Sequence, residues 1–290
     1  MSPNIRTEHI ALPTGVELDV TVGGPPDAPP ILFLHGFPES RRTWRHQIAD
    51  LARDHAVAAP DQRGYARSSK PPGVSSYRVD RIVADALALA DALGWERFTL
   101  AGHDWGGAVA WAAALRHPDR IARLVIANAP HPQVFRDSLE HDAAQRKASS
   151  YILFFRFPGA VSLAEALGPE RLWKGFSRTI PTRLLSEEDK VAYIDEWSQP
   201  GAIRGMLNWY CAMDRKAAAT DLPPVTQPTF VLWGMKDQAL LPVQLDGLDE
   251  HVPDLTVERL PQAGHFTPWE APDAVTAAIR RFLAARPLAA

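Results

Sequence analysis

The sequence predicts an α/β fold with a mostly parallel central sheet, helices on both faces of the sheet and a helical segment inserted late in the chain. Strand-like and helix-like stretches alternate from residue 31 to residue 130. The strand-like stretches are almost continuously apolar, as expected where helices cover both faces of a parallel sheet. The alternation stops near Pro132 and resumes near Thr229, so we expect one sheet to be built from both ends of the chain.

The first part of the chain accounts for most of the expected sheet. Its elements are, in order, strands in 9–15 and 16–22 around a turn at Gly15, a strand in 31–36, a helix from Thr43 to Arg53, a strand in 57–61, a helix capped by Asp80 and ended by Gly94, a strand in 97–104, a helix in 106–118 and a strand in 123–130. Apolar residues of the helix before Gly94 recur every three or four positions, which is typical of a helix with one buried face.

The remaining sequence divides into a helical insertion and a return to the sheet. Residues 132–221 are aromatic-rich and helix-like, without a buried strand pattern. We interpret them as a cap over the strand ends. Strands follow in 229–237 and 255–260, and a last helix begins near Pro272. The predicted organisation is therefore a core formed by 1–131 and 222–290, with the cap 132–221 between its two parts.

Composition excludes several classes of function. The 290 residues include 31 Lys and Arg against 34 Asp and Glu, a net charge of −3 that argues against a nucleic-acid partner. No uncharged apolar run approaches the roughly 18 residues of a membrane span, and the N-terminus has no apolar signal-peptide core. Cys211 is the only cysteine, and the ten histidines show no HExxH spacing. We expect a cytoplasmic protein without metal or organic cofactor; a monomer and a homodimer both fit the sequence.

Residues 102–107, Gly-His-Asp-Trp-Gly-Gly, lie where a predicted strand gives way to a predicted helix. They have the small-x-nucleophile-x-small form of a nucleophile elbow, whose central residue lies on a strained turn. Glycines on both sides leave room for that turn, and Asp tolerates it better than most residues. The helix N-terminus behind Asp104 favours the ionised carboxylate. A helix cap at a glycine-rich turn would give the same pattern.

An aspartate at the elbow restricts the chemistry. Attack by a carboxylate on an ester or amide would form an anhydride, which is more reactive than the starting material. At a saturated carbon the carboxylate forms an alkyl ester, which water can later cleave at its carbonyl carbon. Asp104 therefore predicts a substrate with an electrophilic sp3 carbon, chiefly an epoxide or an alkyl halide.

An acid and a histidine follow Asp104 in the chain order expected for such an elbow. His265 lies in a loop after the predicted strand 255–260, and Asp237 ends the stretch 229–237. We expect His265 to be the general base for the hydrolytic water and Asp237 to hold its imidazole in the correct tautomer. Asn128 occupies another predicted strand end where an acid could serve, but its side chain is neutral, so Asp237 is preferred.

A further turn, His35-Gly36-Phe37-Pro38, follows the apolar residues from Ile31. It can direct the backbone amide of Phe37 toward the elbow. There this amide would join that of Trp105 as an oxyanion hole for ester hydrolysis. A simple Gly-Pro turn after a buried strand is the alternative.

These motifs together resemble the epoxide hydrolases of the α/β-hydrolase fold. The resembling segments lie in the same order and span most of the chain: HGFPES with WRHQ, DQRGYARSSKP, GHDWGG, LNWY and AGHF. The family carries two cap tyrosines that hydrogen-bond the epoxide oxygen. The resemblance assigns one position to Tyr210 in LNWY and the other to Tyr151 in SSYILFF. Both tyrosines have aromatic neighbours, so packing is the alternative role for each.

The resemblance implies conversion of a small-molecule epoxide and water to a vicinal diol, without a metal or an organic cofactor. Asp104 would form the alkyl ester while Tyr151 and Tyr210 stabilise the oxygen, and water activated by His265 would cleave it. Substrate contacts are expected from His35, Pro38, His103, Trp105, Phe154 and Phe266.

Two other readings remain open. A haloalkane dehalogenase would use the same catalytic triad of Asp104, Asp237 and His265, and the indole N–H of Trp105 could bind the halide. The resembling dehalogenases, however, usually have Asn where this chain has Phe37. Fluoroacetate dehalogenases place arginines just after the nucleophile, and residues 105–111 contain none. A non-catalytic member of the fold would bind a small molecule or a protein. Loss of a triad residue would favour that reading, and none is lost.

Overall fold

The computed structural model describes residues 4–213 and 222–288. Within them, one eight-stranded sheet has the order β1-β2-β4-β3-β5-β6-β7-β8. The pairs β1–β2 and β2–β4 are antiparallel, and all other neighbouring strands are parallel. The predicted mostly parallel sheet is confirmed. Its strands are β1 (Arg6–Ala11), β2 (Glu17–Gly23), β3 (Pro30–Leu34), β4 (Ala56–Pro60), β5 (Phe98–His103), β6 (Ile121–Ala127), β7 (Thr229–Gly234) and β8 (Leu255–Leu260).

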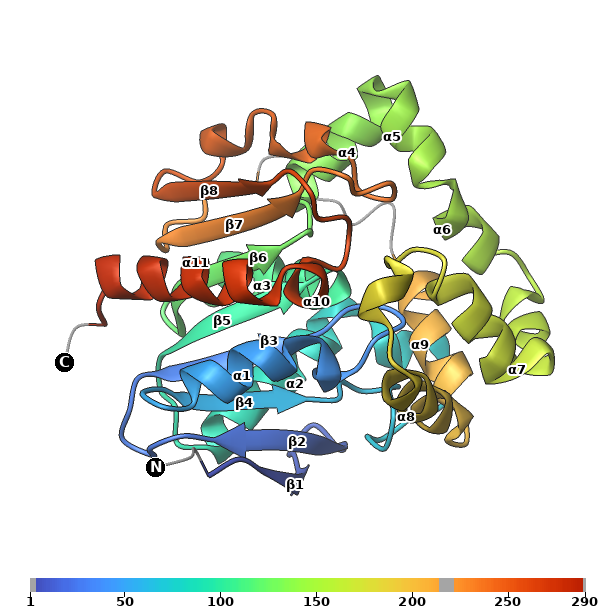
Figure 1. Ribbon diagram of the computed structural model, residues 1–290, viewed down its shortest axis with the longest axis horizontal. Helices are drawn as coiled ribbons and strands as arrows, with labels where there is room; N and C mark the ends of the chain where they lie inside the picture. Colours follow the sequence, from blue (N-terminus) through green and yellow to red (C-terminus); the bar gives the residue numbers. More distant parts are fainter. Residues whose placement is uncertain (1–3, 214–221, 289–290) are drawn as a thin grey trace.

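Helices cover both faces of this sheet, as predicted (Figure 1). The α-helices are α1 (Arg45–Leu51), α2 (Val79–Ala92), α3 (Trp105–Arg116), α4 (Pro132–His141), α5 (Ala143–Ala148), α6 (Ser150–Phe155), α7 (Ala160–Phe176), α8 (Glu187–Ser198), α9 (Ala202–Cys211), α10 (Thr267–Glu270) and α11 (Pro272–Ala285). Short 3-10 helices lie at Arg41–Trp44, Val74–Tyr77, Thr182–Leu184, Pro242–Leu245 and Leu248–Glu250.

Two hydrophobic clusters hold the layers together. On one face of the sheet, α1 and α11 bury side chains such as Ile48 and Phe282 against the strands. On the other face, α2 and α3 contribute Leu89 and Trp111 to a cluster that continues into the later helices. Burial on both faces explains why the central strands are continuously apolar rather than alternating.

Two local predictions need correction. The helix expected from Thr43 is divided into a 3-10 helix at Arg41–Trp44 and α1 at Arg45–Leu51. Asp80 does not cap α2, because Arg78 holds the extended N-cap position and Asp80 lies in the first turn. There the Asp80 carboxylate accepts a hydrogen bond from Arg78 Nε at 3.2 Å. Gly94 does follow the end of α2, with a φ of +76°.

Between β6 and β7 the described residues form helices α4 to α9 and no strand. The end predicted for the cap, residue 221, lies outside the described residues. Helix α8 is fixed to the core by its side chains. Trp197 Nε1 donates to the carbonyl of Pro38 at 2.7 Å, and Asp189 pairs with Arg42 at 3.2 Å. No helix in the described parts of the chain is both long and apolar enough to cross a bilayer.

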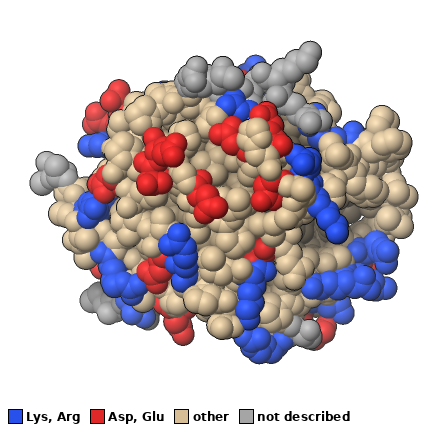
Figure 2. Space-filling model, turned by 90° about the horizontal axis from the view of Figure 1, so that it is seen from above, with Lys and Arg blue, Asp and Glu red and all other residues tan. Residues whose placement is uncertain are grey.

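The outer helices of this segment differ in surface character from the rest. Figure 2 shows Lys, Arg, Asp and Glu interspersed over the face seen from above, whereas the lobe at its upper right is largely uncharged. Helices α6 and α7 lie on that side of the molecule in Figure 1. Their region carries the exposed apolar side chains Leu153, Phe154, Phe157, Leu163 and Leu167.

Candidate active site

The nucleophile elbow joins β5 to α3. Asp104 has φ +50° and ψ −119°, a conformation in which few non-glycine residues are found. Glycines are required beside it because the backbone is close on both sides. A Cβ at Gly102 would overlap the carbonyl oxygen of Gly106, and one at Gly106 would overlap that of Leu34. The turn thus lifts the Asp104 carboxylate above the carboxyl ends of the strands.

The turn after β3 closes over this carboxylate. The backbone N–H of Phe37 donates to Asp104 Oδ1 at 2.8 Å. A Cβ at Gly36 would overlap Asp104, so only glycine permits this approach. Trp105 begins α3, and its amide is one of the first-turn N–H groups that lack an intrahelical acceptor. The two amides expected to form an oxyanion hole thus lie in the turns on either side of the carboxylate.

Loops after β7 and β8 bring the other two triad residues to Asp104. His265 Nδ1 lies 2.7 Å from Asp237 Oδ2, and His265 Nε2 lies 3.4 Å from Asp104 Oδ2. Backbone amides of Ala239 and Leu240 donate to the other oxygen of Asp237, at 2.8 and 2.9 Å. The three residues predicted from strand ends are therefore within contact of one another.

The charges of Asp104, Asp237 and His265 stabilise one another. Burial alone would lower the pKa of His265, but the charges of Asp237 and Asp104 and its hydrogen bonds to them raise that pKa well above its ordinary value. Burial would raise the pKa of Asp104, but the hydrogen bond and charge of His265, with smaller contributions from His103 and the Phe37 amide, lower it. The protein therefore favours an imidazolium between two carboxylates.

Tyr210, on α9, packs directly over the elbow. Only 3% of its surface is exposed, and its ring centroid lies 5.1 Å from those of Phe37 and Trp105. Tyr151, on α6, lies with its ring 6.1 Å from that of Tyr210. Burial, with the nearby Asp104 charge among further causes, raises the pKa of each hydroxyl above its ordinary value. Both phenols are therefore neutral hydrogen-bond donors over the working pH range.

Two of the residues expected to touch substrate lie beneath the site instead. His35 is fully buried: its Nε2 accepts from the backbone N–H of Gln62 at 3.1 Å, so its Nδ1 donates to the Gly36 carbonyl. His103 is also fully buried, with Nε2 donating to the carbonyl of His265 at 2.9 Å and Nδ1 facing Glu39 at 2.6 Å. Neither ring has a nitrogen free for substrate.

Of the other residues expected to touch substrate, two are buried and one is exposed. Phe266 is buried and its ring lies 4.8 Å from that of His265. Pro38 is buried beneath α8, where its carbonyl accepts from Trp197. The side chain of Phe154 is 59% exposed, and its contact with substrate stays a prediction.

Three residues at the site were not predicted in the roles that the structure gives them. Phe155 packs against Phe37 and Tyr210, with ring centroids 5.4 and 5.0 Å apart. Glu39 holds His103, and its place in HGFPES was the signal available in the sequence. Asn128, whose neutral side chain excluded it as the acid in the sequence analysis, donates to Asp237 Oδ2 at 2.7 Å.

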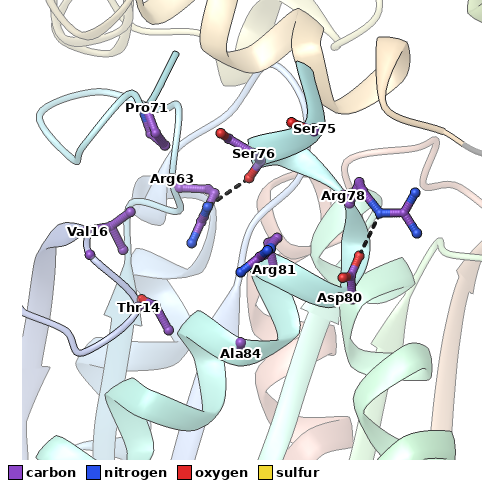
Figure 3. Close-up of a pocket in the computed structure, with 11 residues that line it drawn as sticks. Thr14, Val16, Arg63, Pro71, Ser75, Ser76, Arg78, Asp80, Arg81 and Ala84 are labelled. Carbon is purple, nitrogen blue, oxygen red and sulfur yellow. Dashed lines mark hydrogen bonds and ion pairs between the residues drawn. The ribbon is translucent and has the colours of Figure 1, made fainter. Parts of the chain in front are cut away.

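Two hollows are lined by residues other than Asp104. One of about 350 Å³ lies beside the start of α2, where Arg81 extends toward Thr14 and Arg78 turns away to Asp80 (Figure 3). A wider one, about 1080 Å³, separates residues 173–190 from the loops after β7 and β8. Asp104 and the two tyrosines line neither. Among the described residues no cluster of three or more His, Cys, Asp and Glu is placed to hold a metal ion.

Comparison with known proteins gives a consistent picture. The alpha/beta hydrolase fold model matches residues 29–272. The chain is 37% identical over 273 residues to AB hydrolase superfamily protein YfhM of Bacillus subtilis, which covers 93% of this chain and 95% of that protein. Epoxide hydrolase A of Mycobacterium tuberculosis is 34% identical over 320 residues, covering 96% and 97%. A solved structure described as a novel epoxide hydrolase from metagenomes of hot environments superimposes with a TM-score of 0.89 at 43% identity, covering 96% and 98%.

Proposed function

The chain belongs to the epoxide hydrolases of the α/β-hydrolase fold, and on this basis we propose that it opens epoxides to vicinal diols through a covalent ester on Asp104. The observation that carries the proposal is the position of Asp104. Its carboxylate lies 3.4 Å from His265 Nε2 and accepts from the Phe37 amide, with Tyr210 packed over the elbow. The carboxylate, the imidazole and a neutral phenol donor thus lie next to one another.

In the first step an Asp104 oxygen attacks a ring carbon and the carbon–oxygen bond of the epoxide breaks. The departing oxygen takes a proton from one of the two tyrosine hydroxyls. Formation of the ester removes the negative charge of Asp104, one of the two carboxylates that hold the proton on His265. The imidazolium of His265 then releases that proton, which passes through solvent to the tyrosinate. This transfer restores the tyrosine hydroxyl and leaves His265 neutral.

In the second step neutral His265 Nε2 takes a proton from water, and the resulting hydroxide adds to the ester carbonyl. The oxyanion that forms is stabilised by the Phe37 and Trp105 amides. As the intermediate collapses, the diol oxygen leaves with the second proton of that water. Asp104 is again ionised and His265 again protonated, so atoms and charges return to their starting state.

The helices between β6 and β7 act as the cap in this proposal, with the boundaries 132–221 expected from the sequence. The ring of Phe155 beside those of Phe37 and Tyr210 supports an apolar substrate pocket. We place the enzyme in the cytoplasm, since a chain with one cysteine needs no oxidising compartment.

The proposal is tested by offering the purified protein styrene oxide, a terminal aliphatic epoxide and a trans-disubstituted epoxide beside 1-bromobutane and 1-chlorobutane. We expect diol from at least one epoxide and no halide release. Asp104→Asn is the control for background hydrolysis, because Asn keeps the left-handed turn but cannot attack. Halide release without turnover of any epoxide would replace this proposal with a haloalkane dehalogenase.

A further inference from the structure

Asn128 lies at the carboxyl end of β6, between the strands that carry Asp104 and Asp237. It is fully buried, and its φ is +42°, in the left-handed region that Asn tolerates better than most residues. Its backbone N–H donates to the carbonyl of Leu232 on β7 at 3.1 Å. The main chain therefore holds this side chain at the level of the triad.

The Asn128 amide joins the two loops that carry the acid and the base. Its Oδ1 accepts from the backbone N–H of Gly234 at 3.0 Å and from Thr267 Oγ1 at 3.0 Å. Its Nδ2 donates to Asp237 Oδ2 at 2.7 Å. The Gly234 N–H can only donate, so the amide oxygen must face it and the NH₂ group must face the carboxylate. Only one orientation of the amide satisfies all three partners.

The oxygen of Asp237 that Asn128 holds is the one that orients the catalytic imidazole. Asp237 Oδ2 accepts from Asn128 Nδ2 and from His265 Nδ1, both at 2.7 Å. The other oxygen is fixed separately by the amides of Ala239 and Leu240. Thr267 follows His265 by two positions, so its hydroxyl ties the loop of the base to the same amide.

We propose that Asn128, together with Thr267, is a positioning residue for the hydrolysis of the alkyl-enzyme ester and not for its formation. The inference rests on the covalent mechanism proposed above and deepens it. Attack by Asp104 on the epoxide needs no general base, whereas attack by water needs His265 held with Nε2 toward the ester. An amide that fixes both Asp237 Oδ2 and the His265 loop therefore serves the second step.

The test separates the two steps in single turnovers of styrene oxide with excess enzyme, followed by rapid acid quench and intact-protein mass measurement. Asn128→Asp keeps the size and the acceptor for Gly234, and in its ionised form it loses the donor to Asp237. We expect the hydrolysis rate constant to fall about 10- to 100-fold, because a small misplacement of a reacting group can cost about 100-fold in rate, and the alkylation rate constant to change less than about threefold.

The pH profile gives a second readout that a purely structural role would not alter. The ionised form of Asp at 128 adds negative charge beside the Asp237–His265 pair and stabilises the imidazolium. In Asn128→Asp the rise of the hydrolysis rate with pH should therefore shift to higher pH than in the wild type, while the pH dependence of alkylation stays unchanged.

Matched threonine variants keep the test valid if Asn128→Asp folds poorly. Thr267→Val removes the hydroxyl and should slow hydrolysis selectively, whereas Thr267→Ser keeps it and should restore the wild-type rate. Thr99→Val is the control, since Thr99 is equally buried but bonds Arg123 elsewhere on the sheet. Equal loss in both steps, no loss in either, or the same behaviour of Thr267→Val and Thr99→Val would overturn the inference. A wild type that forms no adduct would instead overturn the covalent mechanism on which it rests.

Discussion

The strand-end loops and the proposed cap, which contains helices α4 to α9, build their parts of the site by different means. Asp104, Asp237 and His265 are fixed by polar contacts of 2.7 to 3.4 Å and by backbone amides on their oxygens. The cap tyrosines are placed by ring packing, with centroids 5.0 to 6.1 Å from their neighbours. Polar contacts specify direction more strictly than ring packing does. The core should therefore determine which step can occur, and the cap how fast the ring opens.

The largest effect is expected from Asp104→Asn in the core. Without the carboxylate oxygen no ester forms, so kcat should fall by about four orders of magnitude or more. The measurement is diol production from styrene oxide, with intact mass showing no adduct. A variant that keeps more than a tenth of wild-type turnover would place the nucleophile elsewhere.

His265→Gln should separate the two steps of the core. Alkylation should continue, but the ester would lack its general base, so turnover should fall about 10²- to 10⁴-fold. Mass spectrometry after addition of epoxide should find the protein heavier by one substrate. An inactive protein of unchanged mass would show that His265 is needed for ring opening, contrary to the division between core and cap.

Tyr210→Phe and Tyr151→Phe test the cap. Each removes one donor to the epoxide oxygen, and we expect alkylation to slow about 10- to 100-fold without accumulation of the ester. Tyr193→Phe is the matched control, because Tyr193 is a buried tyrosine on α8 whose hydroxyl has no hydrogen-bond partner among the described residues. Accumulation of ester in either site variant would mean that the cap acts in hydrolysis as well.

The smallest effect concerns the contact between cap and core. Burial, followed by the charge of Asp61, raises the pKa of Glu196 on α8 from its ordinary 4.5 to about 8. The folded protein thus holds a proton that the unfolded chain releases, so the free energy of unfolding should fall as pH rises from about 4.5 to about 8.

Glu196→Gln replaces the titrating carboxyl group with a neutral amide, so the free energy of unfolding should depend less on pH between about 4.5 and about 8. At pH 8 we expect the variant to gain about 1–3 kcal/mol of unfolding free energy relative to the wild type, and at pH 4.5 little or nothing. Urea unfolding at both pH values measures the difference. An equal difference at both pH values would show that Glu196 is ionised in the folded protein.

The difference between the strand-end loops and the cap also explains how far the sequence could predict the site. The strained turn at Asp104 could be predicted because the close backbone requires glycines at 102 and 106, and those glycines are visible in the sequence. His265 and Asp237 were found because parallel strands end at one edge of the sheet. The element order followed from apolar runs and helical periodicity for the same local reasons.

What the sequence could not give is the direction of side chains within those segments. His103 precedes the nucleophile, but successive residues of a strand point to opposite faces, so it lies beneath the site. Phe154 and Phe155 are adjacent aromatic residues in the apolar run YILFF, and only the packing of α6 selects which one faces Tyr210. The contacts of Asn128 depend on two loops more than a hundred residues away.

The central claim is that an oxygen atom of Asp104 becomes part of the product. It is tested by one turnover of excess enzyme with styrene oxide in water enriched in ¹⁸O, followed by mass analysis of the diol and of the peptide containing Asp104. The account predicts unlabelled diol and one heavy oxygen in that peptide. Heavy oxygen in the diol of the first turnover, with an unlabelled peptide, would contradict it.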